Sequence, residues 1–474
     1  MPLPRALTVL ALSVVLAACA GTGNIAPRAH LADPDALDAG SAIAAARGPG
    51  SWPSAQWWQA LHDDQLDTLV ARALAGNPGL HATAARVRQA AALAGISAQN
   101  TEPRAQLDIT ADRELYSEHG FAPPALAGHY AWRNQATLSG SYDLDLWGRQ
   151  RQSLAAALAE TDVAGAEMQM ARLALETALV RTYIEFALQN ELADILDASL
   201  AQRQRMVDIA RQRQRAGLAA EIDLSLLEAS LPAGERELTQ ARQAIVVLRN
   251  ELAALCGQGP GAGEAIVRPT LAPAQTPGLP SVLPAELVGR RPDIAAQRWR
   301  VEAAARRIDV AEAEFYPNIN LTAFAGLQSL GFGHVLDTGS AIRGVAPALS
   351  LPVFAGPRLR AQLEERTAAY DGAVEQYNAS VVHALADVAN AITQLQSLQQ
   401  QQHQGERALA TAGRAHALAE RAFSAGLGDA LTVLSARLAQ LSEQQQLAHI
   451  RARQRDSFAA LMAALGGGVE AGAP

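Results

Sequence analysis

The sequence predicts a mostly helical protein with a small membrane β-structure, built from two repeats. Proline is absent from residues 125–231 and again from 358–473, stretches of 107 and 116 residues in which very long helices fit. Four shorter segments alternate apolar and polar residues, as strands do. Similar motifs also follow the same order in both halves of the 474-residue chain. Together these observations predict long coiled helices joined to a few membrane strands.

The beginning of the chain predicts export and a lipid anchor. Arg5 precedes an apolar stretch that is too short to cross a bilayer. This stretch ends in Leu16-Ala17-Ala18-Cys19, which resembles the lipobox at which bacteria cleave before an acylated cysteine. We therefore expect a signal peptide over 1–18, a covalent lipid such as palmitate on Cys19, and a lipidated, extended segment over 19–60.

The proline-free stretches have the hydrophobic spacing of coiled coils. Apolar residues recur at alternating steps of three and four, which is typical of a coiled-coil seam. The clearest series is Leu224, Leu227, Leu231, Leu238, Ala241, Ile245, Leu248, Leu252 and Leu255. A helix over 149–214 would be roughly 100 Å long, which exceeds any compact domain. Pro232, followed by Gly234, predicts a kink or local unwinding within this series.

Four segments have the period of two expected of strands, at about 104–112, 132–146, 318–328 and 342–354. Alternation over about ten residues is typical of transmembrane strands, with apolar side chains toward lipid and polar ones, such as Asp143 and Asp145, toward a lumen. A half-buried soluble sheet has the same pattern, but the lipid anchor favours the membrane. Since a barrel needs about eight strands and lipid does not tolerate open edges, we expect an oligomer.

The two halves are internal repeats. Pro78 and Pro292, each opening a helix that leads to a strand, are 214 residues apart, whereas Arg149 and Arg358 are 209 apart. The five-residue difference falls between the two strands of each half, where a loop belongs. We predict repeats over 61–260 and 282–466, joined by a linker over 261–281 and followed by a C-terminal tail over 467–474. Each repeat is expected to run helix, strand, strand, long helix, turn, helix.

The composition argues against catalysis and nucleic-acid binding. The net charge of −8 is diffuse, which does not suit nucleic acid. Cys19 and Cys256 are too few for a zinc site, and the ten histidines lack metal-ligand spacing. The glycine-rich stretch 257–263 follows a helix and has no lysine, unlike a phosphate loop. We expect no enzymatic activity, no metal and no cofactor besides the lipid on Cys19.

Several motifs resemble one known family when they are taken in order. They are Trp57-Trp58, Asn77-Pro78, Tyr142 to Arg149 (YDLDLWGR), Arg290-Arg291-Pro292-Asp293-Ile294, Phe315-Tyr316-Pro317 and Leu351-Pro352-Val353-Phe354. Their order and spacing resemble the outer-membrane efflux protein family, the TolC-like channels of tripartite pumps, and most of all its NodT-type lipoprotein branch. The resemblance covers essentially the whole mature chain, although Pro232 and Pro357 depart from the family pattern.

The resemblance implies a two-repeat TolC-like fold that works as a homotrimer. Twelve strands would close an outer-membrane β-barrel, and the long helices would form a periplasmic α-barrel. The implied function is a passive conduit in the outer membrane of a Gram-negative bacterium, exporting drugs or other small molecules. Its implied partners are an inner-membrane RND-type transporter, a periplasmic adaptor and outer-membrane lipid. The alternatives are a type I secretion or metal-efflux component, or a structural coiled-coil envelope lipoprotein, for which the strands have no purpose.

Both repeats make their helix-to-helix turn at an Ala-Gly-Leu sequence, and glycine suits such a turn because it takes positive φ without steric cost. In the resembling family these turns form the periplasmic tip that adaptors engage and where the tunnel closes. The implied tip residues are Ala216, Gly217, Leu218, Ala425, Gly426 and Leu427. Charged residues beside the turns are candidates for contacts that close the aperture, and they are Arg211, Arg213, Arg215 and Asp429.

Overall fold

The computed structural model describes residues 21–46, 52–121, 123–273, 283–352 and 354–469. The chain forms two compact units, each assembled from segments that lie far apart in the sequence. Of the described residues, those within 21–31, 86–164 and 297–377 form unit 1, and those within 32–85, 165–296 and 378–469 form unit 2. The predicted repeats therefore do not fold as separate bodies, because each unit takes corresponding parts of both.

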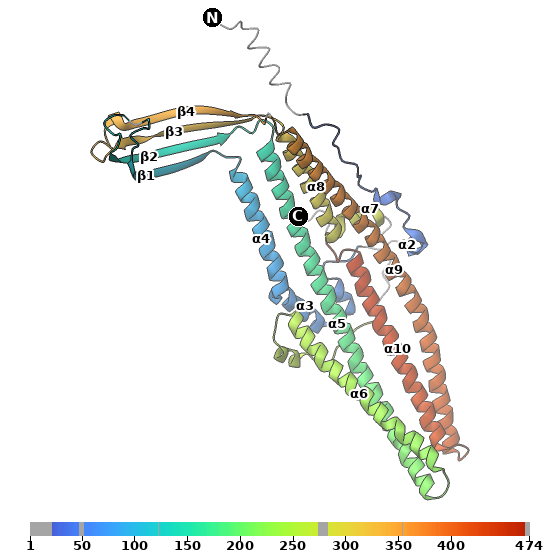
Figure 1. The fold of residues 1–474 in the computed structure, drawn as a ribbon. Coiled ribbons are helices and arrows are strands. Elements are labelled where there is room, and N and C mark those ends of the chain that lie inside the picture. Colours follow the sequence, from blue (N-terminus) through green and yellow to red (C-terminus); the bar gives the residue numbers. More distant parts are fainter. Residues whose placement is uncertain (1–20, 47–51, 122, 274–282, 353, 470–474) are drawn as a thin grey trace. The chain divides into compact units, whose positions relative to one another are not determined.

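Unit 1 contains one antiparallel sheet of four strands in the order β1-β2-β3-β4 (Figure 1). The strands are β1 (Arg104–Leu115), β2 (Tyr130–Asp143), β3 (Asn318–Leu330) and β4 (Ala341–Ser350). The central pair, β2 and β3, comes from different repeats, so the sheet itself joins the two halves of the chain. In the structure of the single chain β1 and β4 each pair on one side only, which leaves two open edges.

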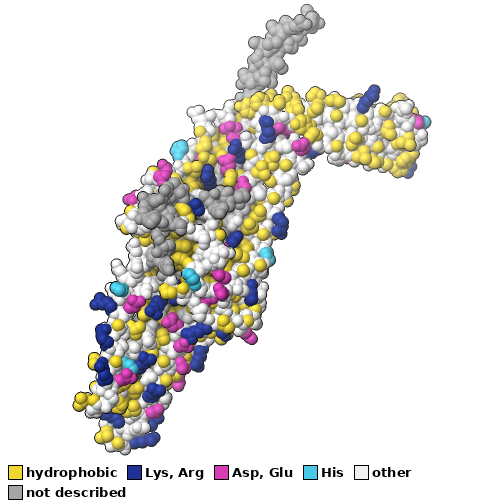
Figure 2. All heavy atoms as spheres, turned by 180° about the vertical axis from the view of Figure 1, so that it is seen from behind, with side chains coloured by type: hydrophobic (Ala, Val, Ile, Leu, Met, Phe, Trp, Pro, Cys, Tyr) yellow, Lys and Arg dark blue, Asp and Glu magenta, His cyan; other side chains and the backbone are white. Residues whose placement is uncertain are grey.

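The register places most apolar side chains of the strands on one face. Leu107 lies opposite Leu138, which lies opposite Ala325, and cross-strand partners share a face. The other face carries Gln106, Asp108, Thr110, Gln135, Thr137, Ser139, Ser141, Asn320, Thr322 and Gln328. The exceptions include Arg113, Asn134 and Arg343 on the apolar face and Phe324, Leu330 and Ile342 on the polar face. Figure 2 shows mostly hydrophobic and uncharged side chains over the strands, and the predicted alternation is confirmed.

β2 and β4 end earlier than predicted, whereas β1 and β3 continue to Leu115 and Leu330, slightly beyond the predicted ends. β2 ends at Asp143 rather than at 146, because Asp145 adopts a φ of 42° and the chain turns there into the following helix. Asp145 is thus a turn residue and not a strand residue facing a lumen. β4 ends at Ser350 rather than at 354, shortly before Pro352, which cannot donate a ladder hydrogen bond.

The helices occur in the predicted order, with one before the two strands of each repeat and two after them. The first repeat has α4 (Pro78–Gln99), α5 (Arg149–Arg215) and α6 (Glu221–Leu255); the second has α8 (Pro292–Ala313), α9 (Gly356–Ser424) and α10 (Ala430–Ala464). α5 and α9 contain 67 and 69 residues. In unit 2, α5 packs on α6 through small clusters that include Leu196 with Leu238 and Val207 with Leu224. The prediction of very long helices is confirmed.

The sequence predicts a kink or local unwinding at Pro232, and the unwinding is not found, because α6 is continuous through this residue. Proline inside a helix costs about 3 kcal/mol, so the surroundings must offset that cost. Arg203 of α5 donates a hydrogen bond from Nη1 to the carbonyl of Ser230, 3.2 Å away, and Gly234 is buried against α5. Packing against the neighbouring helix therefore holds this part of α6 in helical form.

The rest of the chain forms short elements. They are the 3-10 helices η1 (Pro34–Ala36), η2 (Trp57–Leu61), η3 (Pro260–Ala265) and η4 (Thr338–Ser340), and the helices α2 (Gly40–Ala46), α3 (Asp64–Gly76) and α7 (Leu283–Arg290). The segment 19–60 is therefore not wholly extended, contrary to the prediction. Asp33 caps η1 and Ile43 of α2 is fully buried in the core of unit 2, which accounts for local structure in this part of the chain.

The main core lies in unit 2, where α5, α9 and α10 pack with α3 and η2. Tyr183 and Phe186 are fully buried there, and Trp57 packs edge-on to Trp58. The Tyr183 hydroxyl donates to Asp63, 3.0 Å away, and burial raises the pKa of this tyrosine. Asp63 also accepts the backbone N–H of Thr270 at 2.9 Å. The chain after α6 is thereby fixed against α3 and α5. Within the described ranges, no helix is apolar over a length sufficient to cross a bilayer.

Candidate functional site

The predicted tip turns have the same geometry in both repeats. α5 ends before Gly217, with φ of 72°, and α9 ends before Gly426, with φ of 74°. Leu218 N–H donates to the carbonyl of Arg213, five residues earlier, while Gly217 N–H donates to Gln214. The second repeat has the equivalent pair of hydrogen bonds, so both turns are Schellman motifs. The left-handed backbone explains why glycine stands at both positions.

A leucine follows each turn glycine and projects into solvent in the structure of the single chain. Leu218 is 72 % exposed and Leu427 is 85 % exposed. Ile222, the second residue of α6, is 67 % exposed. Burial of a leucine side chain is worth about 1.5–3 kcal/mol, so leucines left in solvent at both turns are suited to contact with another protein.

In unit 2 an ion pair joins the residues beside the turn of the first repeat to those beside the turn of the second. Arg213 at the end of α5 donates from Nη1 to Oδ2 of Asp429 at 2.8 Å. Asp429 occupies the N-cap position of α10, yet its side chain makes no capping hydrogen bond. An N-cap aspartate normally stabilises its helix by about 1 kcal/mol, so here the carboxylate is committed to the other repeat instead.

The remaining candidate aperture residues lie within the α5–α6 hairpin. Arg211 donates from Nη2 to Glu228 of α6 at 2.7 Å and also approaches Asp208 at 3.6 Å. Arg215, the last residue of α5, has no ion-pair partner in the part of the chain that the structure describes. The structure thus brings Arg213 together with Asp429 and separates both from Arg211. Cys19 lies outside the described residues.

A buried charged cluster in unit 2 was not anticipated from the sequence. The Arg291 side chain is 11 % exposed, and its guanidinium contacts Asp293 at 3.0 and 2.7 Å and Asp387 at 3.2 Å. It also donates to the carbonyl of Ala464, the last residue of α10, at 3.1 Å. Burial disfavours the charged guanidinium, but the two carboxylates outweigh this and raise the pKa of Arg291. The cluster ties the start of α8 to α9 and α10.

Apart from Arg215, the charged side chains at the tip and around Arg291 form ion pairs with one another. Among the residues that the structure describes, no three His, Cys, Asp or Glu side chains are placed to hold a metal ion together. The tip presents two backbone turns, exposed leucines and an ion pair between repeats, which is an arrangement suited to a protein contact or a movable closure.

Comparison with known proteins shows relatives over nearly the whole chain. The family model described as outer membrane efflux protein matches residues 69–258 and 283–467. The fusaric acid resistance protein FusA of Burkholderia cepacia is 41 % identical over 76 % of this chain and 68 % of its own length. The multidrug resistance outer membrane protein MdtP of Escherichia coli K12 is 33 % identical over 89 % of this chain and 88 % of its own.

Solved structures agree with these relatives. The outer membrane protein VceC of Vibrio cholerae is 34 % identical and superposes with a TM-score of 0.81, covering 88 % of this chain and all of its own. The fold that was expected from the resemblance is therefore found in a solved outer-membrane protein.

Proposed function

Because this chain belongs to the outer membrane efflux protein family, we propose that it is the outer-membrane conduit of a tripartite efflux system, serving an inner-membrane RND-type transporter through a periplasmic adaptor. Its TolC-like fold and outer-membrane location are those of the family. In this proposal the chain is a passive channel without enzymatic activity, and the transporter supplies the energy.

The four-stranded sheet is the observation that carries the proposal. It has an apolar face with exposed residues such as Leu107 (62 %) and Leu138 (55 %), and two open edges. Open edges leave backbone N–H and C=O groups unpaired, which lipid does not tolerate. Three copies joined β1 to β4 supply twelve strands, enough to close a barrel. In a homotrimer the open strand edges pair with one another, and in the outer membrane the apolar face contacts lipid.

The cargo in this proposal is a drug or another small molecule. FusA is named for resistance to fusaric acid and MdtP for multidrug resistance, and both names refer to small toxic compounds. Type I secretion and metal efflux remain nearer alternatives. A structural coiled-coil lipoprotein is disfavoured, because tethering alone needs no sheet with an apolar face.

Reconstitution into planar lipid bilayers tests the conduit directly. The proposed channel gives discrete, repeated conductance steps that scale with the number of inserted trimers. A structural lipoprotein gives none. Absence of conductance from correctly assembled protein would contradict the proposal.

The proposed anchor is a covalent lipid on Cys19. Cells expressing Cys19→Ala should take up no radiolabelled palmitate on this protein, while the trimer still assembles. Cys256→Ala is the matched control, because Cys256 is buried inside unit 2 and should not affect labelling. If the wild-type protein takes up no palmitate, the anchor is wrong.

The proposed adaptor contact is the pair of turns at Ala216–Leu218 and Ala425–Leu427. A leucine in place of Gly217 or Gly426 is strained at φ above 70° and reshapes the turn. Gly217→Leu and Gly426→Leu should therefore abolish drug export while leaving the trimer in the membrane. Gly165→Leu is the control, because its φ is not positive and a Cβ there meets no neighbouring atom. Normal export by both turn variants would remove the turns from the adaptor contact.

A further inference from the structure

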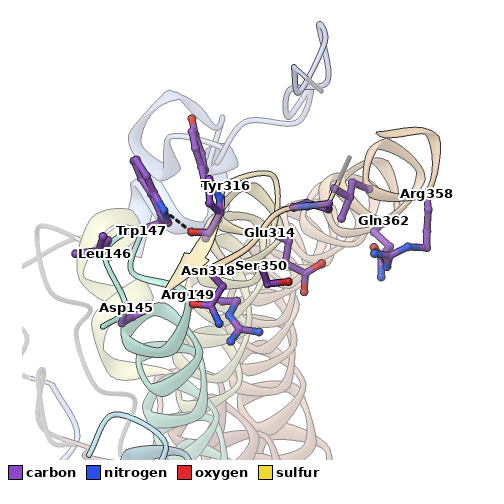
Figure 3. A pocket seen from close by; sticks show the side chains of 14 residues that line it. Asp145, Leu146, Trp147, Arg149, Glu314, Tyr316, Asn318, Ser350, Arg358 and Gln362 are labelled. Atoms are coloured by element: carbon purple, nitrogen blue, oxygen red, sulfur yellow. Dashed lines mark hydrogen bonds between the residues drawn. The ribbon is translucent and has the colours of Figure 1, made fainter. Parts of the chain in front are cut away.

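A pocket of about 280 Å³ lies in unit 1 where the strands meet their helices (Figure 3). The chain between β2 and α5, the start of β3, the end of β4 and the beginning of α9 all contribute to its wall. The tip and the buried cluster around Arg291 belong to unit 2, so this pocket is separate from both.

Two aromatic rings form one side of the pocket. Trp147 and Tyr316 are stacked with centroids 4.6 Å apart and planes 18° apart. The indole Nε1 of Trp147 donates to the carbonyl of Pro317 at 2.8 Å, the dashed line in Figure 3. Both side chains are about half exposed, at 50 % and 45 %. Amphipathic aromatic rings held in this way are typical of the level at which a membrane meets water.

In the first repeat, the arginines at the start of the long helix are neutralised. Arg149 of α5 forms an ion pair with Asp143 at 3.1 Å, and Arg151 approaches Asp145 at 3.5 Å. Asp145 additionally accepts two backbone N–H groups at the start of α5. Each of these cations therefore has its own carboxylate.

The second repeat keeps the arginines and loses the acids. Arg358 and Arg360 stand 209 residues after Arg149 and Arg151, but Pro352 and Phe354 stand where the aspartates would be. Arg358 hydrogen-bonds Gln362 at 2.8 Å, and neither arginine forms an ion pair with any residue that the structure describes. Arg358 lines the pocket and brings an uncompensated positive charge to it.

A carboxylate also lines this pocket. Glu314 follows the last turn of α8, and its side chain has no hydrogen-bond or ion-pair partner within the described part of the chain. The pocket therefore offers one unpaired acid and one arginine without an acidic partner, beside an aromatic wall. This combination suits a ligand that has both charges and an apolar portion.

The beginning of the described chain lies beside α9. Arg360 donates to the carbonyl of Gly21 at 3.5 Å, and Ile25 packs against the cluster that contains Phe315, Leu359 and Leu363. The segment from Gly21 therefore runs close to the first turns of the helix that carries Arg358.

We propose that the pocket binds the zwitterionic headgroup of a membrane phospholipid, phosphatidylethanolamine. Arg358 pairs with the phosphate, Glu314 accepts hydrogen bonds from the ammonium group, and the Trp147–Tyr316 stack contacts the glycerol and upper acyl chains. The inference rests on the proposed function, in which the strands span the outer membrane. The bound lipid fixes the depth at which the sheet sits.

Native mass spectrometry of the full-length, acylated protein tests this binding. Delipidated protein is titrated with phosphatidylethanolamine and, separately, with anionic phosphatidylglycerol. Glu314→Gln should weaken phosphatidylethanolamine binding about ten-fold and leave phosphatidylglycerol binding unchanged. Arg358→Gln should weaken both about ten-fold, because each lipid has the phosphate. Soluble glycerophosphoethanolamine, which lacks acyl chains, should compete only weakly.

Matched controls are Glu312→Gln on α8 and Arg366→Gln on α9, both exposed residues outside the pocket. Both controls should bind lipid as the wild type does. Equal losses in the controls, wild-type binding in both pocket variants, or strong competition by the soluble headgroup would overturn the inference. Conductance of the same wild-type preparation separates the two proposals. Channels without site-specific lipid binding refute only the pocket, whereas lipid binding without channels refutes the conduit.

Discussion

In the first repeat Asn77 holds the last carbonyl of α6, whereas in the second repeat Arg291 holds the last carbonyl of α10. The Asn77 amide donates to Leu255 at 2.9 Å, and the Arg291 guanidinium donates to Ala464 at 3.1 Å. Both donors precede the proline that begins a helix, and both acceptors end the last helix of their repeat. The position is the same, but one repeat uses a neutral amide and the other a buried charge.

The backbone contact beside these two hydrogen bonds is also the same in both repeats. A Cβ on Gly257 would lie 2.1 Å from the carbonyl oxygen of Gly76, and one on Gly466 would lie 2.4 Å from that of Arg290. Both glycines have positive φ. Backbone geometry has thus been kept while the side chains diverged. The donor of this hydrogen bond is neutral in the first repeat and charged in the second. The contribution of each donor to the stability of the fold can be measured.

The largest effect is expected for Arg291→Met. Removing the buried guanidinium takes the cation from Asp293 and Asp387, which are 33 % and 54 % exposed, and removes the hydrogen bond to Ala464. Hydrogen bonds to charged groups contribute about 1.5–3 kcal/mol each. The midpoint of thermal unfolding should fall markedly in scanning fluorimetry at a fixed heating rate. Arg242→Met is the control, because its pair with Asp197 is 65 % exposed on both sides and worth at most about 1 kcal/mol. Equal shifts in the two variants would contradict the buried cluster.

A smaller loss is expected for Asn77→Ala. The variant removes the bond to Leu255 and the cap that Asn77 Oδ1 provides to the N–H of Leu80, 3.1 Å away. Each such hydrogen bond contributes about 1 kcal/mol. The unfolding midpoint should fall less than in Arg291→Met. A lower unfolding midpoint for Asn77→Ala than for Arg291→Met would contradict the stronger contribution expected of the charged donor.

A loss of about 1 kcal/mol is expected for Asp145→Ala, because Asp145 accepts the N–H groups of Gln150 and Arg151 at 2.9 and 3.0 Å. Asp145→Asn should retain most of the stability, since asparagine tolerates positive φ and keeps one acceptor. Phe354 occupies the corresponding position of the second repeat, so Phe354→Ala should not weaken the start of α9. Thermal unfolding of the three variants checks this. Equal midpoints for Asp145→Ala and Asp145→Asn would refute the capping role.

The smallest effect on stability is expected at the tip. Arg213 and Asp429 are 39 % and 49 % exposed, and such pairs contribute about 0–1 kcal/mol. Asp429→Ala should therefore leave trimer stability unchanged, yet raise single-channel conductance if the pair closes the aperture. Arg213→Ala should give the same rise, and the double variant no further rise. Asp197→Ala, which removes an exposed pair with Arg242 and leaves all the candidate aperture residues intact, is the control. Unchanged conductance in Asp429→Ala would remove the pair from the gate.

Much of the fold was readable from the sequence because its signals are local and repeated. The absence of proline predicted α5 and α9, the alternation predicted the faces of the sheet, and the glycines at 217 and 426 predicted the turns. The strand ends were less accurate, because the left-handed conformation of Asp145 leaves no clear trace in an alternating pattern. Local unwinding at Pro232 is not found, because packing on α5 offsets the cost of a proline inside α6.

The candidate site was predicted only in part, because ion pairs join residues far apart in the chain. Arg213 and Asp429 were both named from the sequence, but 216 positions separate them and nothing local identifies them as partners. Asp387 lies 96 residues from Arg291, so this cluster gave no sequence signal. Glu228 follows Arg211 by 17 residues across the turn, and pairing positions along the predicted hairpin would have suggested it.

The open four-stranded sheet is proposed to become a membrane channel only by joining copies of itself. The most direct test is the mass of the detergent-extracted wild-type protein, measured by light scattering with the detergent contribution subtracted. We expect a mass about three times that of one mature chain. A monomer that retains full channel activity would contradict it.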